Sequence, residues 1–205
     1  MKRLATIIAL VCMAFAFTAT VAEAQSKQLK KDSKKEVKAL EKEGWTVLTG
    51  SGTLEYVNLK YRAYIEENPD VVAIYGLAEG ANVKIGRNNA VLNGIADYAT
   101  RASAQVVGKI RGLASADNNQ SRVREIDKFA EAYQTAVNQK IYGIVKQHFV
   151  LVRDEGGRKM FRAYMSFNEK DAKRAREEAF MEANERASLE ELTGTVEDFI
   201  GEPVY

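Results

Sequence analysis

The chain has little cysteine, histidine and proline, and each shortage excludes a kind of chemistry. Its 205 residues contain one cysteine, Cys12, and one histidine, His148. One thiol cannot form a disulfide within the chain, and a zinc site normally draws on several Cys and His ligands. The two prolines, Pro69 and Pro203, leave long stretches free to form helices.

The chain also lacks an excess of charge of one sign. Thirty Lys and Arg residues stand against 28 Asp and Glu, for a net charge of +2. This balance gives no general attraction to nucleic acid, so no nucleic-acid partner is expected. A hydrophobic fraction of 46% with 28% charged residues is typical of a globular protein.

The first 24 residues have the pattern of a signal peptide. A basic start at Lys2 and Arg3 precedes an apolar run from 4 to 21, and small residues follow at Ala22 and Ala24. Signal peptidase requires small residues at these two positions. We therefore expect cleavage after Ala24 and an exported protein, periplasmic or associated with the outer membrane.

Two other interpretations of this segment stay open. An apolar run of roughly 18 residues is long enough to serve as an uncleaved membrane anchor. Cys12 raises the alternative of a lipoprotein, but Val11 stands where a small residue is expected, and the apolar run continues to Val21. If cleavage follows Ala24, the mature chain has no cysteine.

The remaining sequence divides by composition into three parts. Residues 25–44 form a lysine-rich arm, expected to be a solvated or partly frayed helix. Residues 45–192 form the expected α+β domain, and residues 193–205 a C-terminal tail. The arm is also a candidate tether to a membrane surface or acidic polymer, although its interspersed acids argue against this: Asp32, Glu36, Glu41 and Glu43.

Periodic apolar residues predict several elements in the domain. Thr53 is expected to cap a short helix, and the nearly continuous apolar run 71–77 predicts a buried strand. A helix of about 30 residues is predicted from Asn82, and another follows the break at 117–119. The apolar faces of these two helices predict that they pack together as a helical hairpin. The face of the first helix consists of Leu92, Ile95, Ala96, Ala99, Ala102, Val106, Ile110 and Leu113. The face of the second consists of Val123, Ile126, Ala130, Tyr133, Val137 and Ile141.

The C-terminal half predicts a β-hairpin and a last helix. Segments 142–153 and 159–167 flank the turn 155–158, and alternation in the second segment predicts one buried face. Asn168 is expected to cap a helix with an alanine stripe and ion pairs between Lys173 and Glu177 and between Arg174 and Glu178. The fold class is therefore α+β, with a small antiparallel sheet of three to four strands packed against long helices, including a helical hairpin.

The order of these elements resembles that of known secreted proteins. The segments that carry the resemblance are KKEVKALEKEGW, YRAYIEENPDVVAIYGLAEG and VLVRDEGGRKMFRAYMSFNEKDAKRA. They look like uncharacterised secreted proteins of Bacteroides-type bacteria, and more remotely the pattern is similar to envelope lipoproteins of the Lpp-twenty type. The resemblance implies an α+β unit and an envelope location, and it carries over no functional residue.

No catalytic, cofactor-binding or metal-binding residue is predicted, and no cofactor is expected. His148 is interpreted as a half-exposed strand residue. Two groups of acids, Glu66-Glu67 with Asp70 and Asp154-Glu155, are candidate glycosidase pairs, although acids at a helix end or hairpin tip are usually solvated. Tyr164 beside Arg162 is interpreted as an ordinary cross-strand neighbour, with a stacking surface for glycan or peptide as the alternative.

The sequence thus predicts a non-enzymatic exported envelope protein that acts by binding a protein or a surface polymer. One alternative is a carboxylate-dependent hydrolase of the cell envelope. Another is a membrane-surface protein that uses its basic arm at residues 26–43. The composition and motifs do not identify the partner.

Overall fold

The computed structural model describes residues 27–48, 50, 52–114, 120–187, 200 and 202–204. The predicted signal peptide and most of the predicted tail lie outside these residues. The chain divides into two compact units, Met1–Glu67 and Asn68–Tyr205. The boundary between them follows α2, whereas composition placed the start of the domain at residue 45.

The first unit contains a helix over 27–42, the two-residue strand β1 (Thr46–Val47) and α2 (Leu54–Glu67). The two helices contact each other through polar pairs. Buried Ser33 donates its hydroxyl to Asn58 Oδ1 at 2.8 Å, and Arg62 Nε lies 2.6 Å from Glu36 Oε2. The predicted lysine-rich arm is therefore a helix that packs against α2 rather than a free arm.

The second unit contains three long antiparallel strands, β2 (Val71–Gly80), β3 (Lys146–Glu155) and β4 (Arg158–Asn168). β4 pairs with β3 on one side and with β2 on the other, so β2 lies at an edge of the sheet. Positive φ angles at Gly156 and Gly157 close the predicted hairpin between β3 and β4. The predicted small antiparallel sheet is confirmed.

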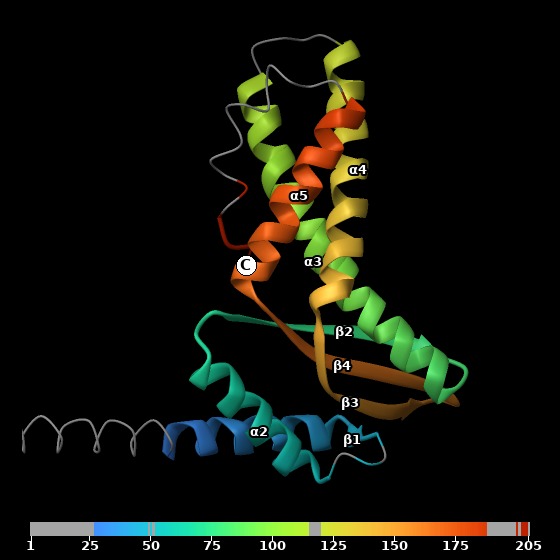
Figure 1. Ribbon diagram of the computed structural model, residues 1–205. Helices are drawn as coiled ribbons and strands as arrows, with labels where there is room; N and C mark the ends of the chain where they lie inside the picture. The colour runs from blue at the N-terminus through green and yellow to red at the C-terminus, as the bar shows by residue number, and fades with distance from the viewer. Residues whose placement is uncertain are drawn as a thin grey trace, which may run out of the picture. The chain divides into compact units, whose positions relative to one another are not determined.

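Three helices complete this unit: α3 (Val83–Ala114), α4 (Gln120–Ile144) and α5 (Glu169–Ala187). α4 packs against both α3 and α5, and α3 begins over the sheet and then extends away from it beside α4 (Figure 1). Large side chains from all these elements share the core, among them Ile95, Tyr98, Phe129, Tyr133, Ile141, Phe161, Met165 and Phe180. The predicted packing of a helical hairpin and a small sheet is confirmed.

Glycines allow α3 to approach β2 closely. A Cβ atom on Gly76 would lie 2.0 Å from the backbone oxygen of Ala90, and one on Gly80 would lie 2.2 Å from Cα of Gly86. Because Gly76 and Gly80 have no side chain, the helix backbone can lie directly over the strand. This contact holds one side of α3 next to β2, at the edge of the sheet.

Helix starts were well predicted from capping residues. Asn82 Oδ1 accepts a hydrogen bond from the backbone N–H of Ile85 at 3.0 Å, and Asn168 Oδ1 accepts one from that of Lys170 at 2.8 Å. Thr53 Oγ1 likewise accepts from the N–H of Tyr56 at 3.3 Å. Each cap satisfies a first-turn donor that has no partner within its helix.

Several predicted details are wrong. Leu92 and Val123 are exposed, because the buried faces of their helices are formed by neighbouring positions. The stretch before Val145 continues α4, so the strand does not begin at Tyr142. Arg174 pairs with Asp171 at 3.2 Å and Glu178 with Lys140 at 3.2 Å, whereas the pair Lys173–Glu177 is confirmed at 3.8 Å.

No helix in the part of the chain that the structure describes is both long and apolar enough to cross a membrane.

Candidate functional site

The most distinctive surface of the second unit is the edge strand β2. The sequence predicts a strand buried on both faces because its run is apolar, but burial alternates in the structure. Ile74 and Ala78 are buried, while Tyr75 is 59% exposed and Leu77 is 38% exposed. The prediction that both faces are buried is wrong because α3 covers only one face of this strand. Large apolar side chains on an exposed edge are a hint of a binding surface.

The backbone of β2 also offers hydrogen-bonding groups that have no partner among the described residues. Asn93 Nδ2 donates to the carbonyl of Leu77 at 2.7 Å, so this carbonyl points away from β4. In an antiparallel pair, residues alternate between those that bond to the partner strand and those whose N–H and C=O groups point outward. Ala73 and Tyr75 share the outward phase with Leu77. We call the outward backbone groups of 73–77 the β2 edge.

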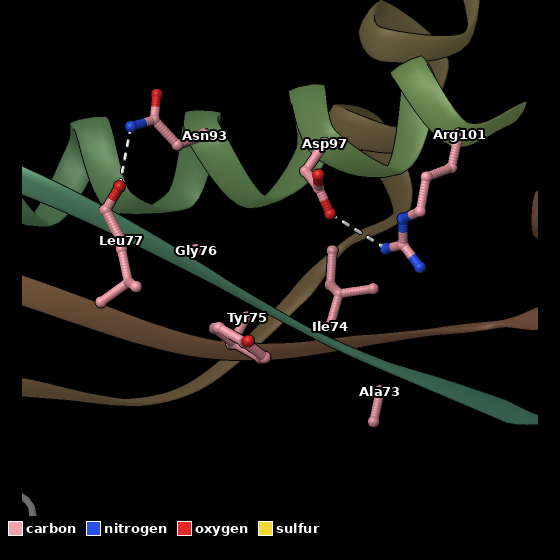
Figure 2. Close-up of a pocket in the computed structure, with 8 residues that line it drawn as sticks. All are labelled: Ala73, Ile74, Tyr75, Gly76, Leu77, Asn93, Asp97 and Arg101. Carbon is pink, nitrogen blue, oxygen red and sulfur yellow. Dashed lines mark hydrogen bonds and ion pairs between the residues drawn. The ribbon is translucent and has the colours of Figure 1, made fainter. Parts of the chain in front are cut away.

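A groove of about 540 Å³ lies along the β2 edge. Residues 73–77 form its floor, and Asn93, Asp97 and Arg101 of α3 form its wall (Figure 2). These three residues are spaced by four, which places them on one face of the helix. The close approach of α3 to Gly76 is therefore what brings this polar row beside the strand.

The wall of the groove carries both charges. Arg101 Nη2 lies 3.2 Å from Asp97 Oδ2, and the two side chains are 41% and 66% exposed. The Nε of Arg101 is buried and has no hydrogen-bond partner within the described residues. Because the protein covers this atom, a ligand can reach Arg101 only through the exposed part of its guanidinium.

Aromatic and cationic side chains lie next to Tyr75 on the face of the sheet opposite α3. The Tyr75 ring lies 6.4 Å from the Tyr164 ring, and the Arg162 guanidinium lies 5.6 Å from the Tyr75 ring centre. Such an arrangement holds the exposed tyrosine in place. Tyr75 is thus a semi-rigid apolar surface next to the β2 edge.

Tyr164 does not form the stacking surface considered from sequence. It is buried, and its ring stacks on that of its cross-strand neighbour Phe149 with centres 4.3 Å apart. The ordinary cross-strand pair is therefore confirmed. Ser166, on the same strand, is buried as well.

His148 is a half-buried strand residue, as predicted. Its Nε2 lies 2.7 Å from Ser166 Oγ. Burial lowers the pKa of His148, and the nearby Lys146 ammonium lowers this pKa further. Both effects disfavour the imidazolium that a serine-activating base must form. They therefore favour a structural role for the hydrogen bond between His148 and Ser166.

The acids singled out in the sequence lie on the surface. Glu66 and Glu67 end α2 and are exposed, as are Asp154 and Glu155 near the hairpin turn. Within the described residues, no group of three or more His, Cys, Asp or Glu side chains is placed to hold a metal ion.

Sequence reasoning missed a buried polar cluster around Arg176. This side chain is 1% exposed and bonds to Tyr98 Oη, to Glu169 Oε1 at 2.6 Å, and to the carbonyls of Ile200 and Glu202 at 3.3 and 3.2 Å. Burial raises the pKa of Tyr98, against the lowering effect of Arg176. The cluster joins α5 and α3 to the end of the chain, so its role is structural.

Comparison of the chain with known protein families, with characterised proteins and with solved structures finds no match. The resemblance to secreted Bacteroides-type and Lpp-twenty-type proteins therefore stays a prediction. The sequence did not point to the groove, because the apolar run 71–77 predicted a strand buried on both faces.

Proposed function

We propose that the protein is a non-enzymatic, exported envelope protein that acts by binding another protein. The observation that carries this proposal is the groove along the β2 edge, where free backbone groups, exposed Tyr75 and Leu77, and the polar row of α3 meet. Apolar side chains beside a small number of placed polar groups are typical of protein-binding surfaces.

The alternatives have less support. Carboxylate-dependent hydrolysis requires two acids facing each other across a cleft, and the candidate acids are exposed at a helix end and near a hairpin turn. A membrane-surface role for the arm requires a free basic segment, and the helix over 27–42 buries Val37 and Leu40.

Photocrosslinking in cells that naturally produce the protein tests the proposal. A photoreactive phenylalanine analogue replaces Tyr75 in one variant and Tyr142 in another, which is 60% exposed on α4 and distant in sequence. We expect one reproducible adduct from position 75 and none from position 142. Equal adducts from both positions, or none from position 75, would contradict the proposal.

Export is tested separately by mass spectrometry of the N-terminus. The signal-peptide pattern predicts a mature chain that begins at Gln25 and fractionates with the envelope. A chain that retains its first residues and stays inside the cell would overturn this part of the proposal.

A further inference from the structure

We infer that the groove binds an extended segment of another polypeptide by strand addition to the β2 edge, with a carboxylate on that segment paired to Arg101. This inference rests on the proposed function and names the chemical class of its partner.

The first argument is the backbone of β2. The N–H and C=O groups of Ala73 and Tyr75 point away from β4, because they share the phase of the Leu77 carbonyl. An extended chain placed about 4.8 Å away would supply the matching acceptors and donors. Asn93 already occupies the Leu77 carbonyl, so the free run of outward groups ends at this residue.

The second argument concerns the two faces of the added strand. Some residues of the added strand would exchange hydrogen bonds with Ala73 and Tyr75. Their side chains would lie on the same face of the sheet as the apolar, aromatic side chain of Tyr75. The intervening residues would project toward the polar row of α3. The groove therefore selects an alternation of apolar and polar residues in its partner.

The third argument is charge. Asp97 pairs with Nη2 of Arg101, and the Arg101 side chain is still 41% exposed, so a ligand in the groove can reach its guanidinium. Guanidinium groups bind carboxylates through two parallel N–H donors. A Glu or Asp on the α3-facing side of the partner would accept hydrogen bonds from the exposed N–H groups of this guanidinium.

A second copy of the chain fits the groove less well. Antiparallel pairing of two β2 edges would place both α3 helices on one face, over strands about 4.8 Å apart. Packed helices need axes about 8–10 Å apart, and α3 lies directly over β2 at Gly76. The α3-facing positions of β2 itself, such as Ile74, also offer Arg101 no carboxylate.

Fluorescence anisotropy with the intact chain tests the inference. The probe is a labelled, end-capped heptapeptide, Val-Thr-Val-Glu-Val-Thr-Val, which places valines on the Tyr75 face and the glutamate on the Arg101 face. A second peptide carries Gln in place of Glu. Because the added carboxylate pairs with a guanidinium that is partly exposed, we expect the Glu peptide to bind about two- to fivefold tighter than the Gln peptide.

Two matched controls separate backbone from side-chain recognition. N-methylation of the two inner valines removes N–H groups that face β2, whereas N-methylation of the two threonines removes N–H groups that face solvent. Only the first should abolish binding. The variant Arg101→Gln should remove the preference for Glu. The variant Arg111→Gln should retain it, since Arg111 is an exposed arginine of α3 that pairs with Asp127 of α4.

Each other outcome contradicts the inference. No binding of the Glu peptide at millimolar concentration excludes this partner class, and equal binding of both methylated peptides excludes strand addition. A chain that is dimeric and becomes monomeric with Ala73→Pro, but not with Ala73→Val, would assign the groove to a second copy. If the peptides fail while position 75 still gives its specific adduct, the inference falls and the proposed function stands.

Discussion

At the scale of single residues, Arg176 is the largest fully buried side chain among the described residues. It is buried with Glu169, Tyr98 and two backbone carbonyls as partners. A buried ion pair adds little net stability by itself, but removing one partner leaves the other uncompensated. The sequence offered no sign of this, because Arg176 lies within a helix rich in exposed charged residues.

We predict that Arg176→Ala lowers the free energy of unfolding by about 3–5 kcal/mol, the usual cost of breaking a buried ion pair. Urea denaturation monitored by circular dichroism measures the change. The matched control is Arg174→Ala, two positions away and exposed, which should change stability by less than about 0.5 kcal/mol. Equal effects of the two substitutions would show that the cluster is not structural.

His148 predicts a dependence of stability on pH. Its pKa is lower in the folded chain because of burial and Lys146. Between the folded pKa and the unfolded value of about 6.5, the unfolded chain binds more protons. The free energy of unfolding should therefore fall as the pH falls below about 6.5.

His148→Gln should reduce this fall, since the chain contains no other histidine. The comparison is of unfolding free energies at several pH values, for the native and substituted chains. A difference between the two chains that does not vary with pH would contradict the assignment.

At the scale of elements, the contact of α3 with β2 positions the candidate site. Apolar spacing predicted where α3 begins and that it packs on its neighbours. They did not predict that β2 lies at an edge, because strand order depends on pairing between segments distant in the chain. For this reason the run 71–77 was predicted to be buried, although Tyr75 and Leu77 are exposed.

We predict that Gly76→Ala destabilises the chain by about 1–3 kcal/mol or more, as expected for overpacking. The added methyl group would meet the backbone oxygen of Ala90 at 2.0 Å, and backbone cannot rotate away as a side chain can. Gly108→Ala in α3 is the matched control, because nothing lies within 4 Å of its Cβ position.

The Gly108→Ala substitution should stabilise the chain by about 0.5–1 kcal/mol, the usual gain in a helix interior. Thermal unfolding distinguishes the two signs. If Gly76→Ala leaves the stability unchanged, α3 does not contact β2 closely at this position, and this contact does not position the wall of the groove.

At the scale of the whole molecule, composition and periodicity predicted the α+β class and the main elements, including the hairpin and the helical pair. The division into two units was harder to predict, because the composition of the lysine-rich segment indicated a solvated helix. Its contacts depend on Ser33 and Glu36 meeting α2 residues about 25 positions away. The groove escaped detection for a similar reason: its wall and floor come from separate elements, and Arg101 looked like any charged residue on the outer face of a helix.

The central claim is that the β2 edge is free in the isolated chain and is covered by a partner strand. Residue-resolved amide hydrogen exchange by NMR tests it directly, on the intact chain with and without the Glu heptapeptide. We predict fast exchange for Ala73 and Tyr75 and slow exchange for Ile74 and Gly76 in the free chain, with the first two becoming slow on binding. Equal protection of all four amides in the free chain, or no change at Ala73 and Tyr75 when the peptide binds, would contradict the account.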